Sequence, residues 1–207
     1  MNIHVLGTGA VGCYVASVLK RNNHNVKLLL RSNAHLNEFS SKNNTITYRS
    51  QGKVDQVTGL KASNMKDYTN PITSLIVATK SQHTLDAVSL VAPYLSPSSS
   101  VLFLQNGMGV VDQLIEKVWL KKNLPSLHVG VNLHAIERKG PYDIHHHSSY
   151  DGSEVLTMAQ YPGTGECKHR LTEAIAQIPE FQAKCLPWEQ LYVRILKKVI
   201  VNASINA

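Results

Sequence analysis

Cysteines, acidic residues and long apolar runs are all scarce in this 207-residue sequence. The three cysteines, Cys13, Cys167 and Cys185, are odd in number and stand at spacings that match no metal site, which predicts reduced thiols rather than a disulfide framework. No run approaches the ~18 to 20 apolar residues that a membrane span needs. The first expected strand begins at residue 2, which leaves no room for a signal or transit peptide ahead of it. These features predict a cytoplasmic protein that does not enter a membrane.

The shortage of acidic residues makes the chain basic, because 14 Asp and Glu face 21 Lys and Arg and the formal net charge is +7. The basic residues are scattered, apart from pairs such as Lys121-Lys122 and Lys197-Lys198, so they do not favour nucleic-acid binding. A general attraction for an anionic cofactor and substrate explains the charge as well. With 43% apolar and 17% charged residues, the chain is typical of one globular domain, or of one domain and the start of another.

The most informative motif is a glycine-rich turn, which follows the apolar run at residues 3–6 and opens a helix-like stretch. It reads Gly7, Thr8, Gly9, Ala10, Val11 and Gly12, the G-x-G-x-x-G pattern of a dinucleotide-binding turn. Backbone N–H groups and the positive end of the helix dipole bind the pyrophosphate in such turns. We therefore assign all six residues to a cofactor site, and the alternative is a tight turn that binds nothing.

Arg31 ends the second expected strand, which covers residues 25–30. A site that prefers NAD usually places an acidic residue here, to accept a hydrogen bond from the ribose 2′-hydroxyl. A guanidinium group instead suits a 2′-phosphate, which favours NADPH over NADH. A solvated arginine at the end of a strand is the alternative.

Apolar runs bounded by turn residues alternate with helix-like segments, which predicts an α/β fold with a doubly wound parallel sheet of the Rossmann type. Beyond Leu127 the segments become shorter and are separated by Gly140-Pro141 and Asp151-Gly152, a pattern typical of antiparallel edge strands. The elements expected after the second strand are short β segments over 45–62, a strand over 74–79, a helix over 82–94, a strand over 100–105, a helix over 110–119, β segments over 127–134, 142–147 and 155–159, a helix over 166–178 and a strand over 183–186.

Polar clusters follow three of the expected strands: the glycine turn, residues 80–82 and residues 106–109. In open parallel sheets, ligands bind beyond the carboxyl ends of the strands. The sequence therefore predicts a site at this edge of the sheet.

The last expected helix runs from Trp188 to the final residues and is apolar around much of its circumference near residues 199–205, so we expect it to be buried. Four polar residues, Arg194, Lys198, Asn202 and Asn206, recur every fourth position and form one line along it. Buried polar groups are costly unless a partner accepts or donates their hydrogen bonds, and a bound keto acid would do so. Alternatively, the line is the solvent face of an amphipathic helix.

Three consecutive histidines, His145, His146 and His147, suggest a metal site at first sight. Alternate residues of a strand face opposite sides, so at most two of them can converge, and no carboxylate or cysteine stands at ligand spacing in the sequence. We therefore expect no metal site. His134 also follows an expected strand, and we expect it to be packed in the interior or to cap an element.

Taken in order, several motifs resemble those of the ketopantoate reductase family, which reduces 2-dehydropantoate with NADPH in pantothenate synthesis. They lie at residues 7–12, 30–31, 79–80, 105–109, 130 with 134–135, and 198–206. The resemblance implies that Arg31 grips the 2′-phosphate of the cofactor, that Lys80 lies near the cofactor, and that Asn106 lies between nicotinamide and substrate.

For the chemistry, the resemblance implies that Lys198 is the general acid and that Asn202 and Asn206 orient the substrate. Hydride would pass from the nicotinamide to the C2 carbonyl of a 2-keto acid, and no metal is needed. The expected partners are this small molecule and, as an option, a second copy of the chain in a homodimer; neither nucleic acid nor membrane is expected.

The sequence departs from the family at its end, because the family continues into a further helical domain. We therefore divide the chain into an NADP-binding domain, residues 1–187, and the start of a truncated helical domain, residues 188–207, and expect a fragment, a truncated product or a relict. Two alternatives remain open: an inactive Rossmann module that binds NADP(H) or a protein partner, and a different NADP-linked 2-hydroxy-acid or sugar-acid dehydrogenase.

Overall fold

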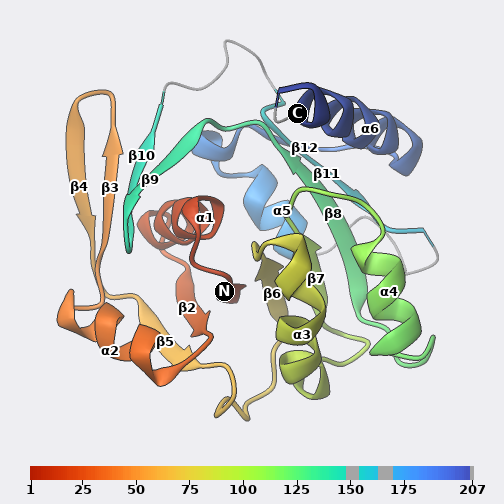
Figure 1. Cartoon of the computed structure of the whole chain (residues 1–207), viewed down its shortest axis with the longest axis horizontal. Helices are drawn as coiled ribbons and strands as arrows, with labels where there is room; N and C mark the ends of the chain where they lie inside the picture. Colours follow the sequence, from red (N-terminus) through yellow and green to blue (C-terminus); the bar gives the residue numbers. More distant parts are fainter. Residues whose placement is uncertain (148–153, 163–169, 206–207) are drawn as a thin grey trace.

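The computed structural model describes residues 1–147, 154–162 and 170–205, and its centre is a twisted, mostly parallel sheet (Figure 1). All neighbouring strands of this eight-stranded sheet run parallel except β8 and β11. This confirms the Rossmann-type sheet with an antiparallel edge. In spatial order the strands are β12 (Ala183–Cys185), β11 (Leu156–Gln160), β8 (Ser126–Asn132), β7 (Ser100–Phe103), β6 (Ser74–Val77), β1 (Asn2–Leu6), β2 (Asn25–Leu30) and β5 (Lys61–Asn64).

Helices cover both faces of the main sheet. Because side chains alternate along a strand, Ile3 and Val5 of β1 pack with α1, whereas Leu6 packs with the cluster under α3 and α4. Each face thus has its own apolar core. The helices are α1 (Ala10–Arg21), α2 (Asn33–Ser41), α3 (Ser81–Val91), α4 (Val110–Lys117), α5 (Arg170–Ala176) and α6 (Trp188–Ile205), and single turns η1 (Ala92–Tyr94) and η2 (Pro179–Phe181) follow α3 and α5.

A second, four-stranded sheet packs on the outer side of α1 (Figure 1). Its order is β4 (Lys53–Val57), β3 (Ile46–Ser50), β10 (Asp143–His146) and β9 (Ile136–Gly140). The expectation that residues 142–147 add an edge strand to the main sheet is therefore wrong. This segment pairs in parallel with β3 instead, because Ile144 and Tyr48 bury their side chains in the same core as Tyr14 of α1.

Apart from the single turn η2, two elements of the described residues have no counterpart among the expected ones, β9 and α2. Helix α2 begins at its N-cap Ser32, whose hydroxyl accepts a hydrogen bond from the backbone of His35, and it packs through Leu36 and the buried Phe39. A nine-residue helix with two large apolar residues gives only a weak periodic signal. The expected helix over 166–178 is seen only as α5, since residues 163–169 lie outside the described part of the chain.

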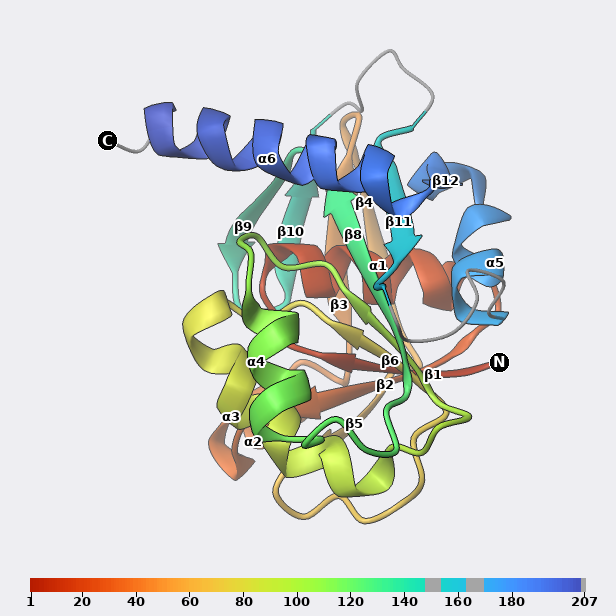
Figure 2. The ribbon, with the colours of Figure 1, turned by 90° about the vertical axis from the view of Figure 1, so that its right-hand side faces the viewer.

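Helix α6 lies across the end of the sheet and extends past it (Figure 2). Leu191 and Ile195 are buried against Val131 and Ala159. The expectation that its later half is buried is wrong, because Ile200 is 64% exposed in the part of the helix that continues beyond the sheet. None of the helices in the described residues combines the length and apolar character needed to cross a membrane.

Candidate functional site

The glycine turn joins β1 to α1, and its three glycines differ in what surrounds them. A Cβ on Gly12 would lie 1.8 Å from the Gly7 carbonyl oxygen. Gly7 has a φ of +101°, and a Cβ there would lie 2.7 Å from the backbone of Ala78 and of Thr79. A Cβ on Gly9 would meet nothing within 4 Å. Two glycines thus allow close backbone packing, and the third leaves an open approach to the helix N-terminus.

The start of α1 is well suited to an anion. Its N-cap, Gly9, has no side chain to cap the first backbone N–H groups, and the first turn holds no acidic residue. These N–H groups have no partner within the helix, and the helix dipole adds positive potential. The turn formed by Gly7, Thr8, Gly9, Ala10, Val11 and Gly12 therefore has the geometry that a pyrophosphate requires.

Arg31 lies directly after β2, at the same edge of the sheet as the glycine turn, since Leu6 and Leu29 are register partners in adjacent strands. Its Nε donates to Nε2 of His35 over 2.9 Å, and His35 Nδ1 lies 2.7 Å from the Ser32 hydroxyl. This chain of contacts positions the guanidinium beside α2. Its terminal nitrogens make no hydrogen bond within the described residues, so they can engage a phosphate.

Lys80 and Gln105 follow the next two strands. Lys80 is exposed at the N-cap of α3. Gln105 is held by its Oε1 atom, which lies 2.5 Å from the buried Thr84 hydroxyl, while its Nε2 atom is buried without a partner in the described structure. An unpaired buried amide is costly, so this nitrogen indicates a ligand with an acceptor group. Gln105 was not predicted as a site residue.

Three predicted residues of the reaction centre line one pocket: Asn106 from the loop after β7, and Lys198 and Asn202 from α6. The Lys198 ammonium donates to the backbone oxygen of Asn132 over 2.6 Å, and burial lowers the pKa of this lysine. Lys197 is exposed, in agreement with the choice of Lys198 from the polar line. Asn206 lies outside the described residues.

Arg194, the first member of the polar line, forms an ion pair away from this pocket. Its guanidinium and the ammonium of Lys184 both bind the carboxylate of Glu154. Arg194 thus fastens α6 to the neighbouring part of the fold, and Lys198 and Asn202 are the members of the line that the pocket lining includes.

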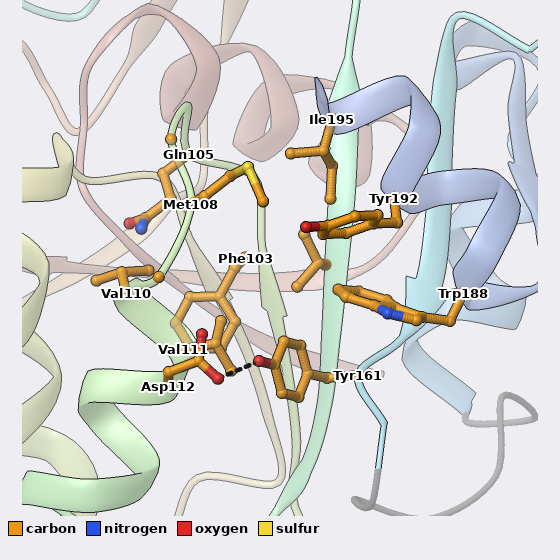
Figure 3. A pocket seen from close by; sticks show the side chains of 13 residues that line it. Phe103, Gln105, Met108, Val110, Val111, Asp112, Tyr161, Trp188, Tyr192 and Ile195 are labelled. Carbon is orange, nitrogen blue, oxygen red and sulfur yellow. Dashed lines mark hydrogen bonds between the residues drawn. The ribbon is translucent and has the colours of Figure 1, made fainter. Parts of the chain in front are cut away.

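An apolar pocket adjoins the first one along α6 (Figure 3). Both pockets share Gln105 and Ile195, so a ligand held at Lys198 can extend into the second. The Tyr161 hydroxyl donates to Asp112 at its edge, and the Trp188 ring meets the Tyr161 ring edge-on. The apolar side chains of its lining are those of Phe103, Met108, Val110, Val111, Val129, Trp188, Tyr192 and Ile195.

His134 lies in the interior, as predicted, away from these pockets. Its Nδ1 lies 3.1 Å from Nε2 of His146, and its Nε2 lies 3.0 Å from the carbonyl oxygen of Phe181. Tyr48 donates to the far nitrogen of His146 over 2.8 Å when both imidazoles are neutral. Burial is the main reason why the pKa of each histidine is lowered, that of His146 to about 4.

Comparison with known proteins identifies the family. Residues 3–161 match the family model for ketopantoate reductase PanE/ApbA. A probable 2-dehydropantoate 2-reductase of Schizosaccharomyces pombe is 30% identical over 99% of this chain and 62% of its own length. The 2-dehydropantoate 2-reductase of Saccharomyces cerevisiae is likewise 30% identical, over 99% of this chain and 59% of its own length.

Solved structures share the fold. A 2-dehydropantoate 2-reductase from Methylococcus capsulatus has a TM-score of 0.74 at 20% identity and covers 100% of this chain and 63% of its own. D-mandelate dehydrogenase, solved with NADH and anilino(oxo)acetate, has a TM-score of 0.76 at 18% identity, covering 98% and 61%. The chain therefore spans less than two thirds of the length of these relatives. From the family match and the alignment of 99% of this chain with the two yeast proteins, we conclude that this chain belongs to the ketopantoate reductase family.

Proposed function

We propose that this chain binds NADPH and supplies the general acid for the reduction of 2-dehydropantoate to pantoate. Members of this family are NAD(P)H-dependent oxidoreductases. The observation that carries the proposal is the convergence of Asn106, Lys198 and Asn202 on one pocket beside the unpaired amide of Gln105.

For the cofactor, the residues present fit a phosphorylated dinucleotide. The open N-terminus of α1 at Gly9 suits the pyrophosphate, Arg31 at the end of β2 suits the 2′-phosphate, and Lys80 adds positive charge at the same edge. The buried Nε2 of Gln105 supplies a donor where the nicotinamide end is expected. When bound, NADPH supplies the hydride.

The protein's own contribution is to hold the keto acid and to deliver a proton. Lys198 has three N–H groups, and the bond to Asn132 fixes one of them. The other two can point at the carbonyl oxygen, stabilise its developing negative charge and protonate it. Because burial lowers the pKa of Lys198, its ammonium gives up a proton more readily than an exposed lysine would.

The amides and the apolar pocket would select the substrate. Asn106 and Asn202 orient the substrate by neutral hydrogen bonds. Asn206, which lies outside the described residues, is assigned the same role only from the family resemblance. The adjoining pocket beside Ile195 and Tyr192 suits the apolar substituents on the carbon next to the carbonyl. In this proposal residues 1–187 form the NADP-binding domain, and residues 188–207 bring the first helix of the substrate-binding part.

The test is a titration of the 207-residue chain with NADPH and NADH by calorimetry, followed by addition of ketopantoate while NADPH absorbance is recorded. We expect NADPH to bind more tightly and to be oxidised only after ketopantoate is added. Lys198→Ala should abolish oxidation and leave NADPH affinity unchanged, while the matched variant Lys197→Ala keeps both. No binding of NADPH, or normal turnover in Lys198→Ala, would contradict the proposal.

The second candidate is a nucleotide-binding module without turnover. The chain matches 62% and 59% of the lengths of the two yeast relatives, and the part that it matches includes the nucleotide-binding turn at the start of α1. The same titration separates the two candidates, because a module binds NADPH but does not oxidise it with ketopantoate. Measuring NADPH oxidation with several 2-keto acids, among them the keto acid of mandelate, separates the reductase from a related 2-hydroxy-acid dehydrogenase.

A further inference from the structure

Two of the three consecutive histidines, His145 and His146, end β10, and His147 follows directly after it, so the alternation of the extended chain decides which side each one faces. His146 points inward and lies 2.8 Å from the hydroxyl of buried Tyr48. His145 and His147 share the opposite face, where their ring centroids lie 4.1 Å apart at an interplanar angle of 36°. Two imidazoles two residues apart on one strand face can bind the same ion, because period-2 spacing brings their nitrogens together.

A carboxylate joins them from the neighbouring strand. Glu137 of β9 is the register partner of His145 in the antiparallel pair β9–β10, and its Oε2 atom lies 3.1 Å from Nε2 of His147. One ligand atom from each of the three side chains lies within 4.8 Å of the others. The expectation of no metal site considered ligand spacing only along the chain, and it did not include the carboxylate that β9 brings across the hairpin (Figure 1).

We propose that Glu137, His145 and His147 form a binding site for a divalent transition-metal ion of the Zn²⁺ and Ni²⁺ type. Imidazole nitrogens suit zinc, nickel and copper, whereas Ca²⁺ and Mg²⁺ prefer sets made of oxygen ligands. Two imidazoles and one carboxylate leave coordination positions open for water or for another ligand. The side chains of Glu137 and His147 are about half exposed, so an ion can reach them from solvent.

The surrounding charges lower the affinity of the site for a metal ion but do not prevent the ion from binding. The ammonium of Lys139 lies 2.8 Å from Oε1 of Glu137, the oxygen that does not face His147. A metal ion at Oε2 would thus replace the contact to His147 and leave the Lys139 contact in place. The nearby positive charge repels a dication, which predicts weaker binding than in a fully anionic site.

The site is tested by calorimetric titration of the 207-residue chain with NiCl₂. Nickel is the better probe, because the exposed thiol of Cys185 is a ligand that zinc also favours. We expect one Ni²⁺ per chain, and an affinity lower by about 10-fold or more in His145→Ala, His147→Ala and Glu137→Gln. His83→Ala removes an exposed histidine of α3 and should leave the titration unchanged. Circular dichroism confirms that each variant is folded.

Three results of the nickel titration would refute the proposed site. If Ni²⁺ binds at several weak sites that the three substitutions do not affect, or if His83→Ala lowers the affinity as much as they do, the ion is bound by scattered histidines and the proposed site is refuted. Absence of binding to the folded wild-type chain also refutes it. The outcome does not depend on NADPH or ketopantoate, so it is independent of the proposed reductase activity.

Discussion

The side-chain ammonium of Lys198, on α6, donates a hydrogen bond to the backbone carbonyl of Asn132, the last residue of β8, over 2.6 Å. This contact joins the helix to the carboxyl end of the sheet and sets the position of the ammonium in the pocket that Asn106 and Asn202 also line. The lysine is held in place by backbone geometry, which a substitution at Asn132 would leave largely intact.

The first prediction concerns the pH dependence of reduction. A general acid must carry its proton, so kcat/KM for ketopantoate should fall as the pH rises through the pKa of Lys198, which lies below the usual lysine value of 10.5 because the side chain is buried. Lys198→Arg should lower kcat by roughly 100-fold or more, because a guanidinium does not release its proton. Steady-state rates across the alkaline range measure both effects. If the fall of kcat/KM at alkaline pH is unchanged in Lys198→Arg, this lysine does not transfer the proton.

The second prediction compares two glycines of the same turn. Gly12→Ala places a Cβ against the Gly7 carbonyl and should lower the free energy of unfolding by about 1–3 kcal/mol. Gly9→Ala meets no neighbour and should change stability by less than about 1 kcal/mol, yet weaken NADPH binding because the methyl group occupies the approach to the helix N-terminus. Urea unfolding and NADPH titration of both variants give the comparison. Equal losses of stability would contradict it.

Features with a local cause could be predicted from the sequence. The glycine turn and the parallel strands follow from short-range spacing, and so does the position of Lys198, and not of exposed Lys197, on the pocket side of α6. The same spacing did not reveal that β3 and β10 pair in parallel, because this contact joins residues far apart in the chain, such as Tyr48 and His146. Nothing in a local pattern identifies such a partner.

The parts of the site that could not be predicted also depend on contacts between residues far apart in the chain. Gln105 stands out only once the Thr84 hydroxyl is seen to occupy its oxygen and leave its nitrogen unpaired. The apolar pocket needs Tyr161 and Trp188 to meet across two elements, and Glu137 needs the register of a hairpin to reach His147. Each depends on tertiary packing, which the periodicity of one segment does not encode.

The third prediction concerns the choice of nucleotide. Arg31→Ala should weaken NADPH binding by about 10- to 100-fold, because a charge-assisted contact to the 2′-phosphate is worth ~1.5–3 kcal/mol, and should leave NADH binding nearly unchanged. His35→Ala serves as the positioning control: it removes the 2.9 Å contact to Nε of Arg31 and keeps the charge, so the loss should be smaller. Titrations with both nucleotides test this. A parallel loss of NADH affinity would show that Arg31 acts on the fold or on a part common to both cofactors.

The last prediction concerns acid stability. Burial lowers the pKa of His134, so the folded protein resists its protonation more than the unfolded chain does. The unfolded chain then binds more protons below the usual histidine pKa of 6.5, and the free energy of unfolding should decrease as the pH falls from there towards the lowered value.

His134→Gln tests this, because a glutamine can still donate to the carbonyl of Phe181 but does not titrate. The variant should be less stable than wild type at neutral pH and should lose less stability on acidification, whereas His83→Ala, at an exposed site, should follow the wild-type curve. Urea unfolding at a series of pH values measures the slopes. If wild type and His134→Gln lose stability in parallel, the titration of this buried histidine makes no contribution to acid unfolding.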